Sequence, residues 1–259
     1  MNLSFDLSGL SGYRSKSQIA RVMTENWVQT NMFCPRCGHR RLSHFQNNAP
    51  VADFLCENCG SQFELKGKNG ALGKKVADGA YDSMIQRITG NDNPDFFFMS
   101  YSAAANRVND FFIVPKYFFV PGIIEKRKPL AETARRAGWT GCNILFDQIP
   151  KQGKIAVVKN GEIIEAGKVV EAVGGTAPLE TENIASRGWL MDTLNIVNSI
   201  QSEVFELKEV YAHVDELSKK HPENRHIKDK LRQQLQILRD KGMLEFLGNG
   251  TYKKAGVVR

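Results

Sequence analysis

The chain has 259 residues, enough for one large domain or two ordinary ones, and 42% of them are hydrophobic. With 24% charged residues this is the composition of a folded protein with a core. No apolar stretch approaches the roughly 18–20 residues of a membrane span, which excludes a spanning helix. The formal net charge of +7 suits a polyanionic partner, although a merely basic protein fits the charge equally well.

The first residues, Met1 to Asp6, contain no basic start followed by an apolar run. We therefore expect no signal peptide, no membrane partner and a cytoplasmic location. We also expect a monomer. In the cytoplasm, paired cysteines are metal ligands more often than disulfides.

A first helix is predicted from Ser15 onward, because Ile19, Met23 and Trp27 recur every four residues. Such a helix presents one apolar side. We expect that side to pack on a central sheet.

Two C-x-x-C pairs follow this helix, and the second pair begins after a gap of eighteen residues. Two such pairs can surround one zinc ion as a tetrahedron of thiolates, and a closed set of this kind is structural because it leaves no position for water. His39 and His44 are surplus to the set, and we expect them at the surface or facing DNA. Cys142 stands alone and is predicted to be a small buried hydrophobe. The predicted zinc ligands, within residues 34–59, are Cys34, Cys37, Cys56 and Cys59.

Residues 51–55 and 62–66 are predicted to be two short strands, with the second cysteine pair in the turn between them. Alternate residues of a strand share a face, so Glu64 and Lys66 point the same way. A turn centred near residues 57–59 places Asp53 opposite residue 63 or 64, and thus beside Glu64 across the hairpin, provided that no bulge intervenes. Two carboxylates can hold a hard cation such as Mg²⁺, and the lysine can orient or deprotonate a water or stabilise developing charge. A charged, solvated strand face is the alternative interpretation.

The next segments are predicted as a loop over residues 67–73, a helix over 76–88, and core strands over 96–100 and 110–114. The loop is either a flexible turn or a contact with the DNA backbone through Lys68. Together these elements predict an α/β domain.

Residues 126–139 combine basic side chains with a tryptophan. Basic residues can bind phosphates, and arginine can also read guanine in the major groove. Trp139 is either an ordinary core aromatic or an exposed ring that covers a methyl group on a base. The candidate DNA contacts here are Arg127, Arg135, Arg136 and Trp139.

Residues 174–178 are predicted to be a linker, which divides the chain into domains at residues 1–180 and 181–259. Helices are expected over residues 189–200, 205–217 and 226–240, followed by a hairpin with an Asn-Gly turn. Three helices and a hairpin indicate a small α+β winged-helix domain.

The charge of this second domain is uneven. Residues 225–259 hold nine Lys or Arg and three Asp or Glu, whereas residues 182–224 hold four Lys or Arg and eight Asp or Glu. The third helix and the wing are therefore the expected DNA-facing side, although a solvated helix face is the alternative. The candidate contacts are Arg232, Gln233, Gln236, Arg239 and Lys253.

The order Pro50, Asp53 and then Glu64-Leu65-Lys66 resembles the PD-(D/E)-x-K nuclease superfamily, although two residues separate Pro50 from Asp53. Longer stretches resemble the DpnI family of restriction endonucleases. The similarity is loosest over residues 161–182. The matching stretches are residues 48–54, 63–66, 93–98, 128–130, 133–139 and 232–241.

This resemblance implies a type II restriction endonuclease that hydrolyses duplex DNA at GATC sites carrying 6-methyladenine. It implies an α/β PD-(D/E)-x-K domain with an embedded zinc site, followed by the winged helix, and that both domains read the methylated site. It gives Asp53, Glu64 and Lys66 the catalytic roles, with Mg²⁺ held by Asp53, Glu64 and the backbone carbonyl of Leu65. Two alternatives remain: a non-enzymatic zinc-ribbon and winged-helix regulator, or a nuclease of the same superfamily with another DNA target.

Overall fold

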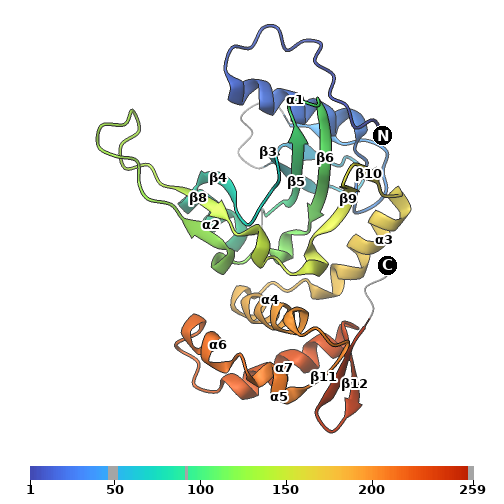
Figure 1. Cartoon of the computed structure of the whole chain (residues 1–259), viewed down its shortest axis with the longest axis vertical. Coiled ribbons are helices and arrows are strands. Elements are labelled where there is room, and N and C mark those ends of the chain that lie inside the picture. The colour runs from blue at the N-terminus through green and yellow to red at the C-terminus, as the bar shows by residue number, and fades with distance from the viewer. Residues whose placement is uncertain (46–51, 91–92, 256–259) are drawn as a thin grey trace.

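The computed structural model describes residues 1–45, 52–90 and 93–255 (Figure 1). Within these ranges, no helix combines the length and apolar character that crossing a membrane requires. Pro50 and Val51, which belong to the predicted motif and its first strand, lie outside the described residues.

A seven-stranded sheet forms the centre of the N-terminal part, in the order β1-β2-β3-β5-β6-β9-β10. β3 and β5 run parallel, and the other neighbouring strands are antiparallel. The strands are β1 (Ser43–His44), β2 (Phe54–Leu55), β3 (Gln62–Asn69), β5 (Asp95–Ser102), β6 (Arg107–Val114), β9 (Ile155–Lys159) and β10 (Glu162–Ile163).

Both faces of this sheet are covered, which explains why the consecutive residues Phe96, Phe97 and Phe98 of β5 are all fully buried. Phe97 packs in the core that includes α1 (Lys16–Asn31) and α3 (Ala166–Thr176). Phe96 and Phe98 belong to a second core on the opposite face. The predicted apolar side of the first helix is confirmed, since Met23 and Trp27 are buried.

The second core continues beyond the sheet into the C-terminal part. It joins Phe98 to Leu194 of α4 (Ile184–Ser199) and to Leu231 of α7 (Ile227–Asp240). Figure 1 shows α4 between the sheet and the last helices. The two parts of the molecule therefore share one apolar interior.

A smaller sheet has the order β4-β8-β7 and lies beside α2 (Tyr81–Thr89). Residues 127–140 connect β7 to β8 and project from the body as a long arm (Figure 1). The strands are β4 (Val76–Ala80), β7 (Ile124–Lys126) and β8 (Gly141–Ile144), and short 3₁₀ helices cover Lys116–Phe118, Pro121–Ile123, Phe146–Gln148, Lys151–Gly153 and Ala177–Leu179.

The C-terminal part is the expected small α+β unit of helices and a three-stranded sheet in the order β11-β13-β12. The predicted third helix and the hairpin after it are confirmed. The elements that complete this part are α5 (Leu207–Tyr211), α6 (Val214–Lys220), β11 (Val204–Glu206), β12 (Leu244–Gly248) and β13 (Thr251–Lys254).

Three predicted segments differ in the structure. The helix predicted over residues 76–88 begins only at Tyr81, because residues 76–80 pair with β8 as a strand. The loop predicted from residue 67 begins later, since β3 continues to Asn69 alongside β5. The helix predicted over 205–217 begins only at Leu207, because Phe205 pairs with Tyr252 in the sheet, and a turn at residues 212–213 divides it into α5 and α6.

The linker predicted over residues 174–178 is also wrong. These residues belong to the end of α3 and to the 3₁₀ helix that follows. Val173 and Thr176 are buried there, and the Thr176 hydroxyl makes a buried 2.6 Å hydrogen bond with the hydroxyl of Tyr117. Tertiary packing therefore overrides the helix-breaking tendency of the glycine pair.

Candidate active site

The hairpin of β2 and β3 brings the predicted catalytic residues together. Phe54 lies opposite Phe63, so Asp53 falls one step further along, beside Glu64. The Asp53 N–H donates to the Phe63 carbonyl at 3.0 Å, and Asp53 Oδ2 accepts from the Leu65 N–H at 2.7 Å. The predicted position of Asp53 beside Glu64 across the hairpin is therefore confirmed.

Lys66 lies on the same side of β3 as Glu64, and its side chain is only 12% exposed. Its Nζ is 2.5 Å from Glu64 Oε1 and also contacts Asp78 Oδ1 of β4. Burial alone would lower the pKa of Lys66, but the two carboxylates outweigh burial and raise that pKa above its usual range. Lys66 is therefore a cation here, which favours charge stabilisation or water orientation over proton abstraction.

The other carboxylate oxygen of Glu64 contacts Arg87 Nη1 from α2. Each Glu64 oxygen thus faces a cationic side chain. A divalent ion held by Glu64 would have to replace part of this contact. Sequence reasoning did not select Arg87, because an arginine in the last turn of a helix is common and carries no motif.

Two further side chains lie beside the hairpin, Glu25 and His44, and the sequence patterns did not indicate either as part of the site. Glu25 of α1 is buried, and the nearby Asp53 carboxylate contributes to raising the pKa of Glu25, after the larger effect of burial. His44 Nε2 is 3.3 Å from Glu25 Oε2, and the ring packs edge-on against Phe54. His44 is thus half-buried beside the acidic group and not at an open surface, and the alternative that it faces DNA stays a prediction.

Burial also raises the pKa of Asp53, against the opposing hydrogen bond from the Leu65 N–H. A carboxyl whose pKa is raised on folding destabilises the folded protein when it is charged. This cost is absent below its ordinary value of 3.8 and develops as the pH rises through the raised value. A cation beside Asp53 would relieve it.

We therefore expect Asp53→Asn to raise the unfolding temperature of the Mg²⁺-free protein at neutral pH by about 2–4 °C, which corresponds to about 1 kcal/mol for a chain of this size. Thermal unfolding in buffer without Mg²⁺, with the zinc ion retained, measures this shift, which should shrink as the pH falls. Asp95→Asn is the matched control: Asp95 is buried but accepts two hydrogen bonds from Arg36, so its substitution should lower the unfolding temperature. A lower unfolding temperature for Asp53→Asn would contradict the argument.

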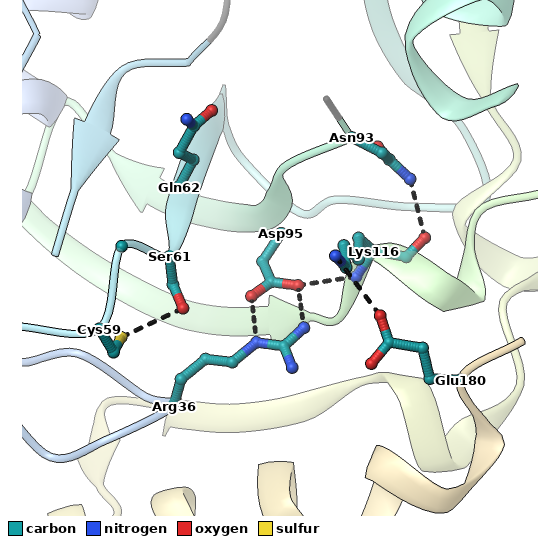
Figure 2. Close-up of a pocket in the computed structure, with 9 residues that line it drawn as sticks. Arg36, Cys59, Ser61, Gln62, Asn93, Asp95, Lys116 and Glu180 are labelled. Atoms are coloured by element: carbon teal, nitrogen blue, oxygen red, sulfur yellow. Dashed lines mark hydrogen bonds and ion pairs between the residues drawn. The ribbon is translucent and has the colours of Figure 1, made fainter. Parts of the chain in front are cut away.

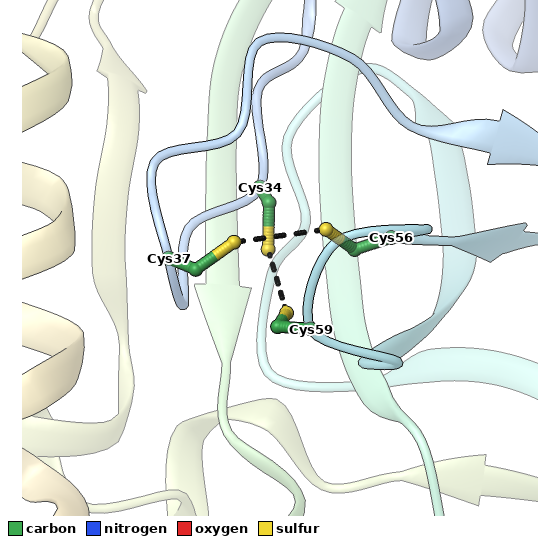
Figure 3. A group of neighbouring side chains, drawn as sticks. All are labelled: Cys34, Cys37, Cys56 and Cys59. Carbon is green, nitrogen blue, oxygen red and sulfur yellow. Dashed lines mark hydrogen bonds between the residues drawn. The ribbon is translucent and has the colours of Figure 1, made fainter.

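The four paired cysteines form one cluster, in which the Sγ atoms all lie within 4.8 Å of one another (Figure 3). Cys34 is 3.6 Å from Cys59, and Cys37 is 3.7 Å from Cys56. This set of sulfur ligands fits a tetrahedral zinc ion. Cys142 lies outside the cluster and is fully buried, as predicted.

Each cysteine pair is closed by a tight turn in which the N–H of the residue after the pair donates to the carbonyl of the first cysteine at 2.8 Å. Gly38 and Gly60 occupy these positions with φ of 76° and 72°, a region that glycine adopts without strain. The second turn directly joins β2 to β3, because the Cys56 N–H donates to the Ser61 carbonyl. The cysteine cluster therefore sets the register that aligns Asp53 with Glu64.

A polar cavity of about 320 Å³ lies beside this cluster (Figure 2). Arg36, between the first two cysteines, donates to both oxygens of Asp95 at 2.6 and 2.7 Å. Asp95 Oδ1 also accepts from the Lys116 N–H at 2.8 Å. Arg36 thereby fastens the cysteine cluster to the start of β5.

The candidate DNA contacts on the arm differ in exposure. The three arginines are exposed: Arg127, Arg135 and Arg136. Trp139 is half-buried, and the Arg136 guanidinium carbon lies over it, 4.7 Å from the centre of the tryptophan ring. A Cβ at Gly141 would come within 2.9 Å of the Trp139 ring, so the ring packs against the backbone at the start of β8. Its contact with a methyl group stays a prediction.

The remaining candidates lie on two other elements. Lys68 Nζ donates to the Leu72 carbonyl at 2.8 Å, so it stabilises its own turn. The outward side of α7 and the wing carry exposed side chains, as predicted, and their contact with DNA is untested. They are Arg232, Gln233, Gln236, Arg239 and Lys253.

Comparison with protein families gives two matches that together span most of the chain. Residues 1–182 match the model described as DpnI, the Dam-replacing family. Residues 185–254 match the model described as DpnI_C, the Dam-replacing HTH domain. The first match contains the acidic hairpin and the cysteine cluster, and the second contains α7 and the wing.

Proposed function

Because the chain belongs to the DpnI family of methylation-dependent restriction endonucleases, whose C-terminal domain is a helix-turn-helix domain, we propose that it is a type II site-specific deoxyribonuclease. Its proposed substrate is duplex DNA at GATC sites that carry 6-methyladenine. The observation that supports this most is the meeting of Asp53, Glu64 and Lys66 on one hairpin.

Asp53, Glu64 and the backbone carbonyl of Leu65 would hold a catalytic Mg²⁺ ion. All three donors are oxygen atoms, which suits a hard cation, and the half-buried Asp53 carboxylate gains from a neighbouring positive charge. When bound, the ion would polarise the scissile phosphate and lower the pKa of a bound water. The separate sulfur cluster would hold a structural zinc ion.

The protein's own groups would then position the reactants. The Lys66 ammonium, kept charged by its carboxylate neighbours, would orient the attacking water and stabilise the charge that develops at phosphorus. Arg87, which already contacts Glu64, adds a second positive charge beside the same carboxylate. Glu64 and Lys66 lie on the strand β3 and Arg87 on the helix α2, and such elements hold side chains more rigidly than a loop.

DNA would be bound by both parts of the chain. The arm of residues 127–140 and the outward side of α7 are the proposed contact surfaces, since both expose basic side chains. A PD-(D/E)-x-K fold for residues 1–180, a winged-helix domain from residue 181, action as a monomer and a cytoplasmic location belong to the same proposal.

A digest of one plasmid, prepared from a host that methylates GATC and from one that does not, tests this proposal. We expect Mg²⁺-dependent cutting of the methylated copy alone. Equal cutting of both copies would indicate a nuclease with another target. Persistent DNA binding without cutting would indicate a non-enzymatic regulator.

A further inference from the structure

Asp78 of β4 is an acidic residue in the site that lies outside the catalytic motif. Its side chain is 8% exposed, and its Oδ1 contacts the Lys66 Nζ. The same oxygen accepts from the Gly79 N–H at 2.7 Å. Asp78 is thus held in one orientation by its own backbone, with its charge directed at the lysine.

A β-bulge produces this orientation. Asp78 pairs with Cys142 of β8, but the next pair is Ala80 with Gly141, which leaves Gly79 as an extra residue. Bulges of this kind bend a strand and re-aim a side chain, and they are frequent beside active sites. The Cys142 Sγ donates to the Gly79 carbonyl at 3.5 Å, which holds the bulge from the partner strand.

The need for Asp78 follows from competition at Glu64. Without a divalent ion, Glu64 Oε1 accepts from Lys66 and Glu64 Oε2 from Arg87. If Glu64 holds the catalytic ion, that ion neutralises the carboxylate and repels the ammonium of Lys66. Asp78 is the second carboxylate that Lys66 already contacts.

We propose that Asp78 is a positioning residue that keeps the Lys66 ammonium in the active site while Glu64 holds the divalent ion. This inference rests on the proposed nuclease function. It explains why the bulge directs a charged side chain into a half-buried site, where an unpaired carboxylate would be costly.

The kinetic test compares Asp78→Asn, Asp78→Glu and Glu125→Gln with the wild type. Asp78→Asn keeps the size and an acceptor oxygen but loses the charge, so we expect kcat at saturating Mg²⁺ to fall by about 10–100-fold. The KM for methylated DNA and the Mg²⁺ concentration at half-maximal rate should not change. Asp78→Glu should restore part of the rate.

Glu125→Gln is the matched control. Glu125 lies on β7 of the same small sheet, and its Oε1 is 2.5 Å from Lys75 Nζ, so it forms a similar carboxylate–lysine pair near the surface. Its substitution should leave cleavage unchanged.

A second measurement needs no cleavage. A double-mutant cycle of Asp78→Asn with Lys66→Met, followed by chemical unfolding of the zinc-loaded protein without and with Mg²⁺, measures the coupling between the two side chains. We expect non-additive losses of stability, and a larger non-additivity when millimolar Mg²⁺ is present, because the pair with Glu64 is then weakened.

Three results would overturn the proposal. The first is a double-mutant cycle in which the stability losses of Asp78→Asn and Lys66→Met simply add. The second is a shift of the Mg²⁺ midpoint by Asp78→Asn with kcat unchanged, which would make Asp78 an ion ligand. The third is a wild-type protein that cuts no DNA: this refutes the nuclease function, and with it this role, even if the cycle shows the pair.

Discussion

Lys66→Ala is expected to reduce cleavage of methylated DNA by about 10²–10³-fold while leaving DNA affinity nearly unchanged. The lysine is the cation closest to Glu64 Oε1, and removing one group that stabilises a transition state typically costs about 10²–10³-fold. Lys66 is only 12% exposed, so it contributes little to the surface that attracts DNA. Single-turnover cleavage and a binding assay in Ca²⁺ measure the two effects separately.

Lys159→Ala provides the control for loss of one positive charge. Lys159 is exposed at the end of β9, and two strands, β5 and β6, separate β9 from β3 in the central sheet. That variant should cut at the wild-type rate. Near-normal cleavage by Lys66→Ala would refute the role assigned to the lysine.

Cys56→Ser is expected to release the zinc ion, unfold the hairpin and destroy cleavage. Structural zinc contributes about 10–16 kcal/mol of apparent binding free energy in small zinc fingers. Here the ligand also begins the turn that joins β2 to β3, since the Cys56 N–H donates to the Ser61 carbonyl at 2.8 Å. Losing the turn separates Asp53 from Glu64. Zinc content by mass spectrometry, circular dichroism and cleavage are the measurements.

Cys142→Ala is the matched control, because Cys142 is equally buried but lies outside the four-cysteine cluster. It should keep its zinc ion and its fold. A folded, zinc-free and active Cys56→Ser protein would contradict the prediction.

The hairpin was predictable because local rules determine it. A period of two places Glu64 and Lys66 on one face, and the length of the cysteine turn sets the partner of Asp53. The structure has this register. The third helix was predictable for a similar reason, since Leu231, Leu235 and Leu238 recur on one side and are all fully buried.

The rest of the site depends on distant packing that no local pattern encodes. Asp78 was assigned to a helix, and only its pairing with Cys142 in β8 makes it part of a bulged strand. Glu25 interrupts an ordinary amphipathic helix, and its burial beside Asp53 depends on where that helix crosses the sheet. The glycine pair before Thr176 remained helical because tertiary contacts outweighed propensity.

The cysteine cluster also determines how the protein would respond to oxidants. Cys34 and Cys56 are buried, but Cys37 and Cys59 are exposed. Peroxide or a thiol-reactive reagent would therefore react with these exposed cysteines of the zinc site and not with the proposed catalytic carboxylates or lysine. Oxidation there would expel the ion and misalign the carboxylates, so activity would be lost by chemistry that spares the catalytic residues. Reductant and zinc supplied together would be the appropriate rescue.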